Sequence, residues 1–553
     1  MKISQVRKGG LLLLFVILLL WFAPSQVVAQ RHERIVGAWK PMHYDVAISF
    51  NDQLTEISSA QTEITVKVLA VSLTVIDLDF SDLPVDSVAI SGQPATFERK
   101  PELLDVMLPH AAKNGDTLTI VVTYHGRPRD GLIFAGDRDG KPSAIGDNWP
   151  NRVHQWIPCL DHPSAKATVS FTISAPPREI VVANGRFVSM TRDGGALPVW
   201  RYEETKPIPP YCMLIAVNEG AKLDANEQTV TPLSYYVPQR DRLYAAKGFS
   251  AGAPALAFFT ETIAPYPYEK LALIIGATRF GGMENSSAIV FTSTLFDLRP
   301  NEKMSAHFGI PARIESVVAH EIAHQWFGDS VTESTWADLW LSEGFATYFA
   351  GLFIEKYESE AAFHDYMRSA AERYFAYEKQ RRAPIHDTET QDLMKLLNAN
   401  NYEKGAWVLH MLRRRLGDEA FFGGLRVYYG AHHDGNATTE DLQQALEKAS
   451  GENLHEFFAR WVYGAGHPVY ELSSGASELS GAGQFLTITL RQTQVGEAFL
   501  DPVTIEITNG GMKQRTLIRP KGKVASVRVR TKGPPTSIQI DPDEMLLKEI
   551  VGK

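Results

Sequence analysis

Residues 320–329 read His-Glu-Ile-Ala-His-Gln-Trp-Phe-Gly-Asp, and residues 340–344 read Trp-Leu-Ser-Glu-Gly. No Gly or Pro interrupts the run from Ile314 to Phe327, so this run predicts one helix. Side chains four residues apart lie on the same face of a helix, so His320 and His324 are expected to point together. The pattern predicts a metal site around which the rest of the chain is arranged.

The two carboxylates near these histidines have different expected roles. Glu321 lies on the adjoining face, where it can take a proton from a metal-bound water but is poorly aimed to be a ligand. A catalytic zinc takes three protein ligands and keeps one position open for water. Glu343 is the candidate for the third ligand, on a second helix that follows Gly328 and that Ser334 or Thr335 can cap.

The His-Glu-x-x-His pattern also arises by chance on surface helices, so the residues around it help to decide whether it marks a metal site. Here the flanking residues are large and apolar, which indicates a buried pair of helices: Trp326, Phe327, Trp336, Trp340 and Phe345. A bare His-Glu-His cluster in an apolar core is costly unless a metal or a charged partner satisfies it. The context therefore favours a metal site.

With three further segments, the sequence resembles the zinc aminopeptidases of the aminopeptidase N family, gluzincins that also include leukotriene hydrolases. The matching segments follow the family order: Gly281-Gly282-Met283-Glu284-Asn285, HEIAHQWFGD at 320–329, WADLWLSEGFATYF at 336–349 and Tyr402-Glu403-Lys404-Gly405-Ala406. The resemblance implies a metalloprotease, a hydrolase that removes the N-terminal residue of peptides. It implies one zinc per chain, bound by His320, His324 and Glu343, with Glu321 as the general base.

The segment from Gly281 to Asn285 is the candidate substrate-binding edge, formed by Gly281, Gly282, Met283, Glu284 and Asn285. It follows a predicted strand, and glycines there let another backbone approach closely. A peptide can lie against it as an added strand, with Glu284 facing the α-ammonium group. The alternative is an ordinary Gly-Gly turn with a solvated Glu. The resemblance implies the first reading, because relatives hold the substrate N-terminus with the matching Glu.

Tyr402 lies just before a predicted helix, a position where a tyrosine most often serves packing. Attack of water on a peptide carbonyl creates an oxyanion, which a positioned donor stabilises. The resemblance implies that Tyr402 donates its hydroxyl to this oxyanion, as the matching tyrosine does in the family.

Several positions depart from the family pattern. Many relatives carry a Gln or Glu that helps to bind the substrate amine, and the matching position in this chain falls near Trp149. Asp147 or Asn148 is the candidate substitute for that side chain. Ser342 stands in place of the usual Asn, and Ser286-Ser287 stand in place of Trp-Gly. We expect these serines to leave the chemistry intact.

A chain of 553 residues predicts two to four domains. Alternating β-branched segments predict an all-β domain at residues 30–231, helical runs predict the catalytic domain at 232–467, and a period of two returns in a C-terminal β-sandwich at 468–553. The fold class is multidomain α+β, and the resemblance implies a thermolysin-like, mainly α catalytic domain. Many relatives continue into a large helical domain over the active site, and we expect none here because the sequence ends at Lys553.

Residues 1–29 are a predicted signal peptide. Basic residues at positions 2, 7 and 8 precede an apolar run from Leu11 to Phe22, and small residues precede a cleavage point before Gln30. An uncleaved membrane anchor is the alternative, but the run is shorter than the ~20 residues that span a bilayer. We expect a secreted or periplasmic protein with no stable membrane span after cleavage.

Net charge and cysteine content argue against two other classes of protein, nucleic-acid-binding proteins and disulfide scaffolds. The formal net charge of -9 is modest for this length and no long basic run occurs, which argues against nucleic acid as a main partner. Only Cys159 and Cys212 are present, far fewer than in a disulfide scaffold. They can pair in an oxidising compartment. Cys159, however, lies in a segment that resembles the family's Pro-Cys-x-Asp, where the cysteine is commonly unpaired, so we expect two free thiols.

Other functions are compatible with parts of this pattern. The same zinc centre can serve an endopeptidase or a zinc epoxide hydrolase, although Glu284 in its motif argues against an endopeptidase. An inactive peptide-binding relative would keep the fold, but it would have no reason to retain three ligands, the base and Tyr402. We therefore expect an aminopeptidase whose partners are peptides with a free N-terminus.

Overall fold

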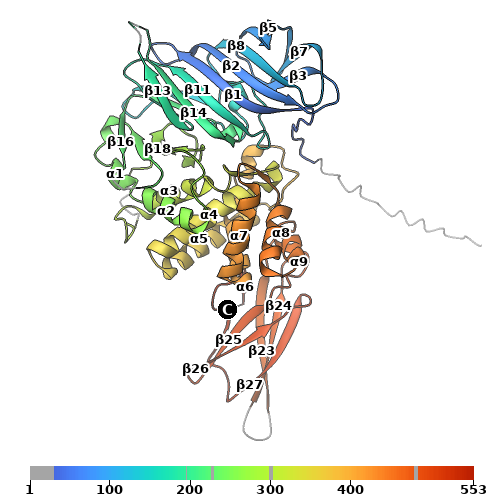
Figure 1. Cartoon of the computed structure of the whole chain (residues 1–553). Helices are drawn as coiled ribbons and strands as arrows, with labels where there is room; N and C mark the ends of the chain where they lie inside the picture. Colours follow the sequence, from blue (N-terminus) through green and yellow to red (C-terminus); the bar gives the residue numbers. More distant parts are fainter. Residues whose placement is uncertain are drawn as a thin grey trace, which may run out of the picture.

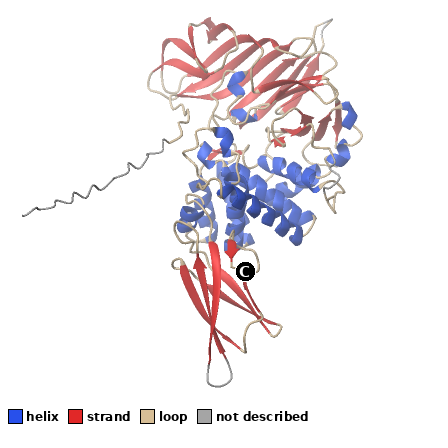
Figure 2. Ribbon diagram, turned by 180° about the vertical axis from the view of Figure 1, so that it is seen from behind, coloured by secondary structure: helices blue, strands red, loops and turns tan. Residues whose placement is uncertain are grey.

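The computed structural model of the chain describes residues 30–192, 194, 196–225, 229–297, 303–478 and 484–552. The predicted signal peptide at residues 1–29 lies outside the described residues. Figure 1 shows a β-rich N-terminal part at the top, a mainly helical middle part and a β-rich C-terminal part at the bottom. Figure 2 shows the same division from behind, coloured by secondary structure. The predicted fold class is confirmed.

The N-terminal part is a β-sandwich, because its strands bury every second side chain. In β1, for example, Tyr44, Val46 and Ile48 are buried. Among the described residues, the large sheet contains β1 (Trp39–Phe50), β2 (Ile57–Val68), β4 (Val85–Ile90), β5 (Gln93–Pro94), β8 (Thr117–Gly126), β11 (Ala167–Ser174), β13 (Arg186–Thr191) and β14 (Val199–Ile208). The sheet that shares its core contains β3 (Leu73–Asp79), β6 (Phe97–Lys100) and β7 (Leu103–Ala112).

A third sheet connects this sandwich to the middle part. It contains β9 (Leu132–Gly136), β10 (Pro142–Gly146), β12 (Ile180–Ala183) and β15 (Ile215–Asn218). Side chains of this sheet, such as Ile145 and Val182, pack against Ile274 and Val290 of the catalytic sheet. The loop after β10, which carries Trp149, is thereby brought to the catalytic part.

The catalytic sheet begins earlier in the chain than the domain boundary at residue 232. Its spatial order is β16-β17-β18-β20-β19, with β16 (Ala221–Asp224), β17 (Leu233–Val237), β18 (Leu271–Gly276), β19 (Gly282–Met283) and β20 (Ala288–Thr292). Because β16 pairs with β17, Ala221 to Asp224 belong to this sheet rather than to the N-terminal domain. Strand β19 forms one edge and pairs only with β20 among the described strands.

Helices make up most of the remaining catalytic part. Those described are α1 (Ala245–Gly248), α2 (Gly252–Thr262), α3 (Ala312–His324), α4 (Trp340–Tyr357), α5 (Glu360–Glu378), α6 (Gly405–Leu416), α7 (Asp418–His432), α8 (Thr439–Ser450) and α9 (His455–Trp461). Strands β21 (Val331–Glu333) and β22 (Gly435–Ala437) form a short parallel pair beside them. Helix α5 begins where the Ser359 side chain accepts from the N–H of Ala362, an ordinary N-cap.

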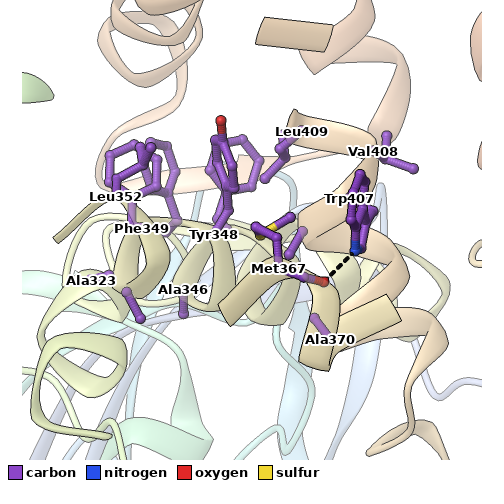
Figure 3. Packing of buried hydrophobic residues seen from close by; sticks show 14 of the residues in the cluster. Ala323, Ala346, Tyr348, Phe349, Leu352, Met367, Ala370, Trp407, Val408 and Leu409 are labelled. Carbon is purple, nitrogen blue, oxygen red and sulfur yellow. Dashed lines mark hydrogen bonds between the residues drawn. The ribbon is translucent and has the colours of Figure 1, made fainter. Parts of the chain in front are cut away.

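Helix α4 is the central helix of this part, and most of its side chains are buried on all sides. Figure 3 shows Tyr348, Phe349 and Leu352 of α4 among buried side chains of neighbouring helices. The Trp407 indole N–H of α6 donates to the carbonyl of Met367 in α5 at 2.9 Å (Figure 3). A helix that is apolar all round is held by packing on every face. Glu343 is therefore fixed on a rigid element.

The C-terminal part is a small β-sandwich whose core is continuous with that of the helices. One sheet contains β23 (Val469–Glu478), β24 (Gln484–Gln492), β27 (Val524–Thr531) and β29 (Glu549–Val551), and the other contains β25 (Val503–Asn509), β26 (Met512–Ile518) and β28 (Ser537–Ile540).

Cys159 and Cys212 are buried, free thiols, as the sequence predicted. Within the described part of the chain, no helix has the length and apolar character needed to cross a membrane.

Candidate active site

Helix α3 presents His320 and His324 one turn apart, and their Nε2 atoms lie 3.0 Å from each other. The helix ends at His324, so the prediction of a helix through Phe327 is wrong by three residues. The chain turns there because Gly328 adopts a φ of +123°, and a Cβ at this position would lie 2.4 Å from the Ser342 hydroxyl. The tight turn brings the carbonyl of Phe327 to His324.

The other ring nitrogen of His324, Nδ1, has two polar contacts. It lies 3.2 Å from the carbonyl oxygen of Phe327 and 3.0 Å from the hydroxyl of Ser342. Such contacts fix the tautomer and the direction of a metal-binding imidazole. Ser342, which replaces the family's usual Asn, thus supports a candidate ligand.

Glu343 completes the cluster from the first turn of α4. Its Oε2 lies 3.3 Å from Nε2 of His320 and 3.4 Å from Nε2 of His324. This oxygen is buried and has no hydrogen-bond donor among the described residues. Two imidazoles and one carboxylate that converge in this way are the donor set of a catalytic zinc site. The residues therefore fit the predicted metal.

The helix that carries Glu343 does not begin as predicted. Residues Trp336–Asp338 form a 3-10 turn, and α4 begins only at Trp340. Thr335 precedes the turn but makes no side-chain cap, and its hydroxyl donates to the Asp338 carboxylate at 3.1 Å instead. The expected cap by Ser334 or Thr335 is therefore absent, and the N–H of Trp336 is bonded to Glu33 of the N-terminal segment.

Charges in the cluster are strongly coupled. Burial alone would raise the pKa of Glu343, but the nearby His324 and His320 lower it to about 2. Burial would lower the pKa of His324, but Glu284 and Glu343 raise it to about 10. Burial, together with the charges of Glu284 and Glu343, raises the pKa of Glu321 well above its ordinary value. Three carboxylates around two imidazoles make this a site for a cation.

Glu321 lies under the substrate-binding edge. A Cβ at Gly282 would lie 2.4 Å from the Glu321 carboxyl, so only glycine permits this approach. Glu321, Glu284 and His324 also form a second group of donor atoms within 4.8 Å of one another. The group with His320 and Glu343 matches zinc better, because it offers two nitrogens. Glu321 is then left free to act as a base.

The predicted substrate edge is the edge strand β19. Gly281, Gly282, Met283 and Glu284 line a cavity of about 1260 Å³ that also contains His320, Glu321 and Glu343. Glu284 is 6 % exposed, and burial, partly opposed by His324, raises its pKa to about 7. The fifth predicted residue differs: Asn285 is fully buried and does not line the cavity, because the chain turns inward after Glu284.

Tyr402 reaches the same cluster from a π-helical turn, Asn400–Lys404, which leads directly into α6. Its hydroxyl donates to Oε1 of Glu343 at 2.6 Å, and its ring stacks parallel to that of His320. The turn can approach α4 because Gly344 and Gly405 touch: a Cβ at Gly344 would lie 2.9 Å from Cα of Gly405. These glycines place the tyrosine beside the metal site.

The predicted second amine anchor is wrong in this structure. Asp147 is turned away from the cavity, where its carboxylate lies 3.3 Å from the Arg152 guanidinium and accepts from the Arg279 N–H. Asn148 donates to a backbone carbonyl and accepts from the Trp156 indole. Trp149 lines the cavity instead, so the wall is aromatic here. Both polar side chains serve to hold the loop.

Two residues that matter here were not predicted from the sequence. Gln325 bonds to the turn after Glu284, and Glu33 caps the turn before α4. Gln325 offers one signal, since it is a polar residue between the candidate ligand His324 and the apolar Trp326. Glu33 offers none, because its partner is remote in the chain.

The chain matches the family model for the Peptidase family M1 domain over residues 248–461 and the model for the Peptidase M1 N-terminal domain over residues 40–212. Together these ranges cover more than half of the chain. The chain belongs to peptidase family M1. The matched catalytic range contains His320, His324, Glu343 and Tyr402, so the residues that resemble the family lie in its catalytic domain.

Relatives of this M1 chain include "Probable aminopeptidase 1" of Saccharolobus solfataricus, 26 % identical over 453 residues, which are 78 % of this chain and 55 % of that protein. "Aminopeptidase M1" of Arabidopsis thaliana is 30 % identical over 348 residues, which are 61 % of this chain and 39 % of that protein. The chain thus spans about half the length of such relatives or less. The M1 zinc metallopeptidase of Deinococcus radiodurans superposes with a TM-score of 0.64 at 24 % identity, over 78 % of this chain and 95 % of that one, which shows the shared fold.

Proposed function

We propose that this M1 family member is a zinc-dependent aminopeptidase. The observation that carries the proposal is the convergence of His320, His324 and Glu343 in one cavity with Glu284 on the neighbouring sheet edge. The first three residues fit a catalytic metal, and the fourth fits a free α-ammonium group. Several relatives carry the name aminopeptidase, which supports the same conclusion.

The cavity can hold a peptide rather than only an amino acid. Its volume of about 1260 Å³ exceeds the ~300–1000 Å³ that is usual for small-molecule sites. Strand β19 offers a free backbone edge along this cavity, so an extended peptide can pair with it. A peptide bound in this way lies with its N-terminal residue between Glu284 and the metal ligands.

A zinc ion held by His320, His324 and Glu343 would supply a Lewis acid that polarises the scissile carbonyl and acidifies water. Glu321 takes a proton from the attacking water and delivers it to the leaving amine nitrogen. The Tyr402 hydroxyl, which donates to Glu343 in this structure, is the donor that we assign to the developing oxyanion.

Glu284 determines which bond is cut. Its carboxylate binds the α-ammonium of the substrate, and only the first peptide bond then reaches the metal and Glu321. A blocked N-terminus lacks the positive charge that matches Glu284. This preference for a free N-terminus distinguishes an aminopeptidase from an endopeptidase or an epoxide hydrolase with the same centre.

Hydrolysis of amino-acid anilides, with and without a chelator, tests the proposal. We expect turnover that the chelator abolishes and added zinc restores. Peptides with a free N-terminus should be cleaved one residue at a time, and their N-acetylated forms should be poor substrates. Equal cleavage of free and blocked peptides at internal bonds would show that the protein is an endopeptidase and not an aminopeptidase.

We also propose that the mature protein is secreted or periplasmic. The basic, apolar and small-residue segments of residues 1–29 support this location. N-terminal sequencing of protein recovered from cell fractions tests it, and we expect a mature chain that starts at Gln30. An intact N-terminus in the membrane fraction would show an anchor instead.

A further inference from the structure

Gln325 directly follows the ligand His324 and is fully buried. Its Nε2 donates to the carbonyl oxygen of Glu284 at 3.0 Å and to the Asp329 carboxylate at 2.8 Å. Its Oε1 accepts from the N–H of Ser287 at 2.8 Å and from the Tyr266 hydroxyl at 3.0 Å. Both donors and both acceptor positions of the amide are therefore used, which fixes its orientation.

The segment that Gln325 holds is the turn from Glu284 to Ser287, which connects β19 to β20. Ser287 adopts a φ of +62°, in the left-handed region that non-glycine residues seldom occupy. Such a backbone persists only when its surroundings determine it. Gln325 bonds to both ends of the turn, so it determines the path of the chain just after the substrate edge.

Other contacts hold the same turn, but they do not reach Glu284. The Ser287 hydroxyl accepts from the N–H of Gly185, and its carbonyl accepts from the Lys270 ammonium at 2.9 Å. Within the described residues, Gln325 is the side chain that bonds to the backbone of Glu284. It is also the neighbour of a metal ligand. One residue thus connects the metal centre to the candidate amine anchor.

We infer that Gln325 is a positioning residue that fixes the separation between the metal centre and the Glu284 carboxylate, and so fixes cleavage after the first residue of the substrate. The inference rests on the proposed function. An extended residue spans about 3.3–3.6 Å, so the ammonium and the first carbonyl carbon keep a fixed separation. A displacement of about 1 Å in such a site costs about a hundredfold in rate. If the turn were free to shift, a substrate whose ammonium is bound at Glu284 would no longer have its first carbonyl at the metal centre.

The test compares three variants on a free peptide and on its N-acetylated form. Gln325→Met keeps the side-chain volume and removes all four bonds, and Gln325→Asn keeps an amide too short to span the turn. The control Tyr266→Phe removes the contacts of the hydroxyl with Gln325 and with the Lys270 carbonyl, neither of which involves the turn. For each variant, kcat/KM on both substrates, zinc content and Tm are measured.

We expect both Gln325 variants to lose about ten- to a hundredfold in kcat/KM on the free peptide and less than about threefold on the acetylated one. Zinc content should stay near one per chain, and Tyr266→Phe should lose little on either substrate. If a folded, zinc-loaded Gln325 variant loses the same factor on both substrates, or none, the positioning role is overturned. If the parent protein cleaves neither substrate, the proposed function itself fails.

Discussion

The carboxylate of Glu33 accepts a hydrogen bond from the backbone N–H of Trp336 at 3.2 Å, although 303 residues separate the two in the chain. Trp336 begins the 3-10 turn that leads into α4 and Glu343. The same carboxylate pairs with Arg31 at 2.7 Å and with His162 at 3.0 Å. Burial would raise the pKa of Glu33, but His162 and Arg31 keep it below its ordinary value. The N-terminal segment thus caps the turn before the ligand-bearing helix.

Replacing Glu33 with Ala should destabilise the protein by about 2 kcal/mol, because it leaves buried donors without an acceptor. Tm should fall, and zinc should be lost at a lower chelator concentration than in the parent, since the start of α4 is less constrained. Chelator titration followed by elemental analysis measures this. The exposed Glu63→Ala in the same domain is the control, and an equal effect of both variants would refute a specific role for Glu33.

Replacing Glu321 with Gln should abolish turnover and leave the metal in place. Glu321 is not among the three residues that fit the ligands best, and in the proposed mechanism it is the base that takes a proton from the attacking water. A general base contributes about 10²–10⁴ in rate, so kcat should fall by at least that factor. Metal analysis should still give about one zinc per chain. Near-normal turnover in a zinc-loaded variant would contradict the mechanism.

Replacing Glu343 with Ala should lower both metal content and activity. The variant loses the one anionic residue of the proposed ligand set. In the parent protein, Oε2 of Glu343 is the oxygen that lies within 3.4 Å of both histidine Nε2 atoms. Excess zinc should restore activity only in part. Unchanged metal content by elemental analysis would show that the third ligand is another residue, such as Glu321.

Replacing Glu284 with Ala should reduce kcat/KM on free peptides by about ten- to a hundredfold, because a charge-assisted hydrogen bond contributes about 1.5–3 kcal/mol. The acetylated peptides lack the ammonium and should lose little more. Kinetics on matched free and acetylated pairs check this. A common factor on both classes would show that Glu284 acts through structure or metal geometry.

Replacing His154 with Gln should flatten the dependence of stability on alkaline pH. Burial would lower the pKa of His154, but its hydrogen bond to Asp161 at 2.7 Å and the charges of Asp161 and Asp79 raise it to about 9. The folded protein therefore keeps a proton that the unfolded chain releases near pH 6.5. Its stabilising effect is complete below pH 6.5 and is lost as the pH rises through 9.

The contribution of this one proton changes by at most about 1.4 kcal/mol per pH unit. Tm measured between pH 6 and 9.5 should fall more steeply in the parent than in His154→Gln. The difference between the two curves isolates His154 from the other groups that titrate in this range. Parallel curves would show that His154 has an ordinary pKa in the folded state.

The sequence by itself determined the parts of the site that local geometry controls. Helical spacing brings His320 and His324 to one face, and the turn at Gly328 follows from the conformations that glycine alone adopts freely. Alternating and helical periodicities separated the sandwiches from the helical part. The need for a third zinc ligand pointed to Glu343, and the family motifs supported it and added Tyr402.

Only the tertiary structure decided which groups meet across long separations in the chain. It placed Glu33 on Trp336, turned Asp147 and Asn148 away from the cavity, and put Trp149 into its wall. It also placed Gln325 between the metal helix and the turn after Glu284. No local preference encodes these contacts, because each depends on how separately formed sheets and helices pack to satisfy their buried polar groups.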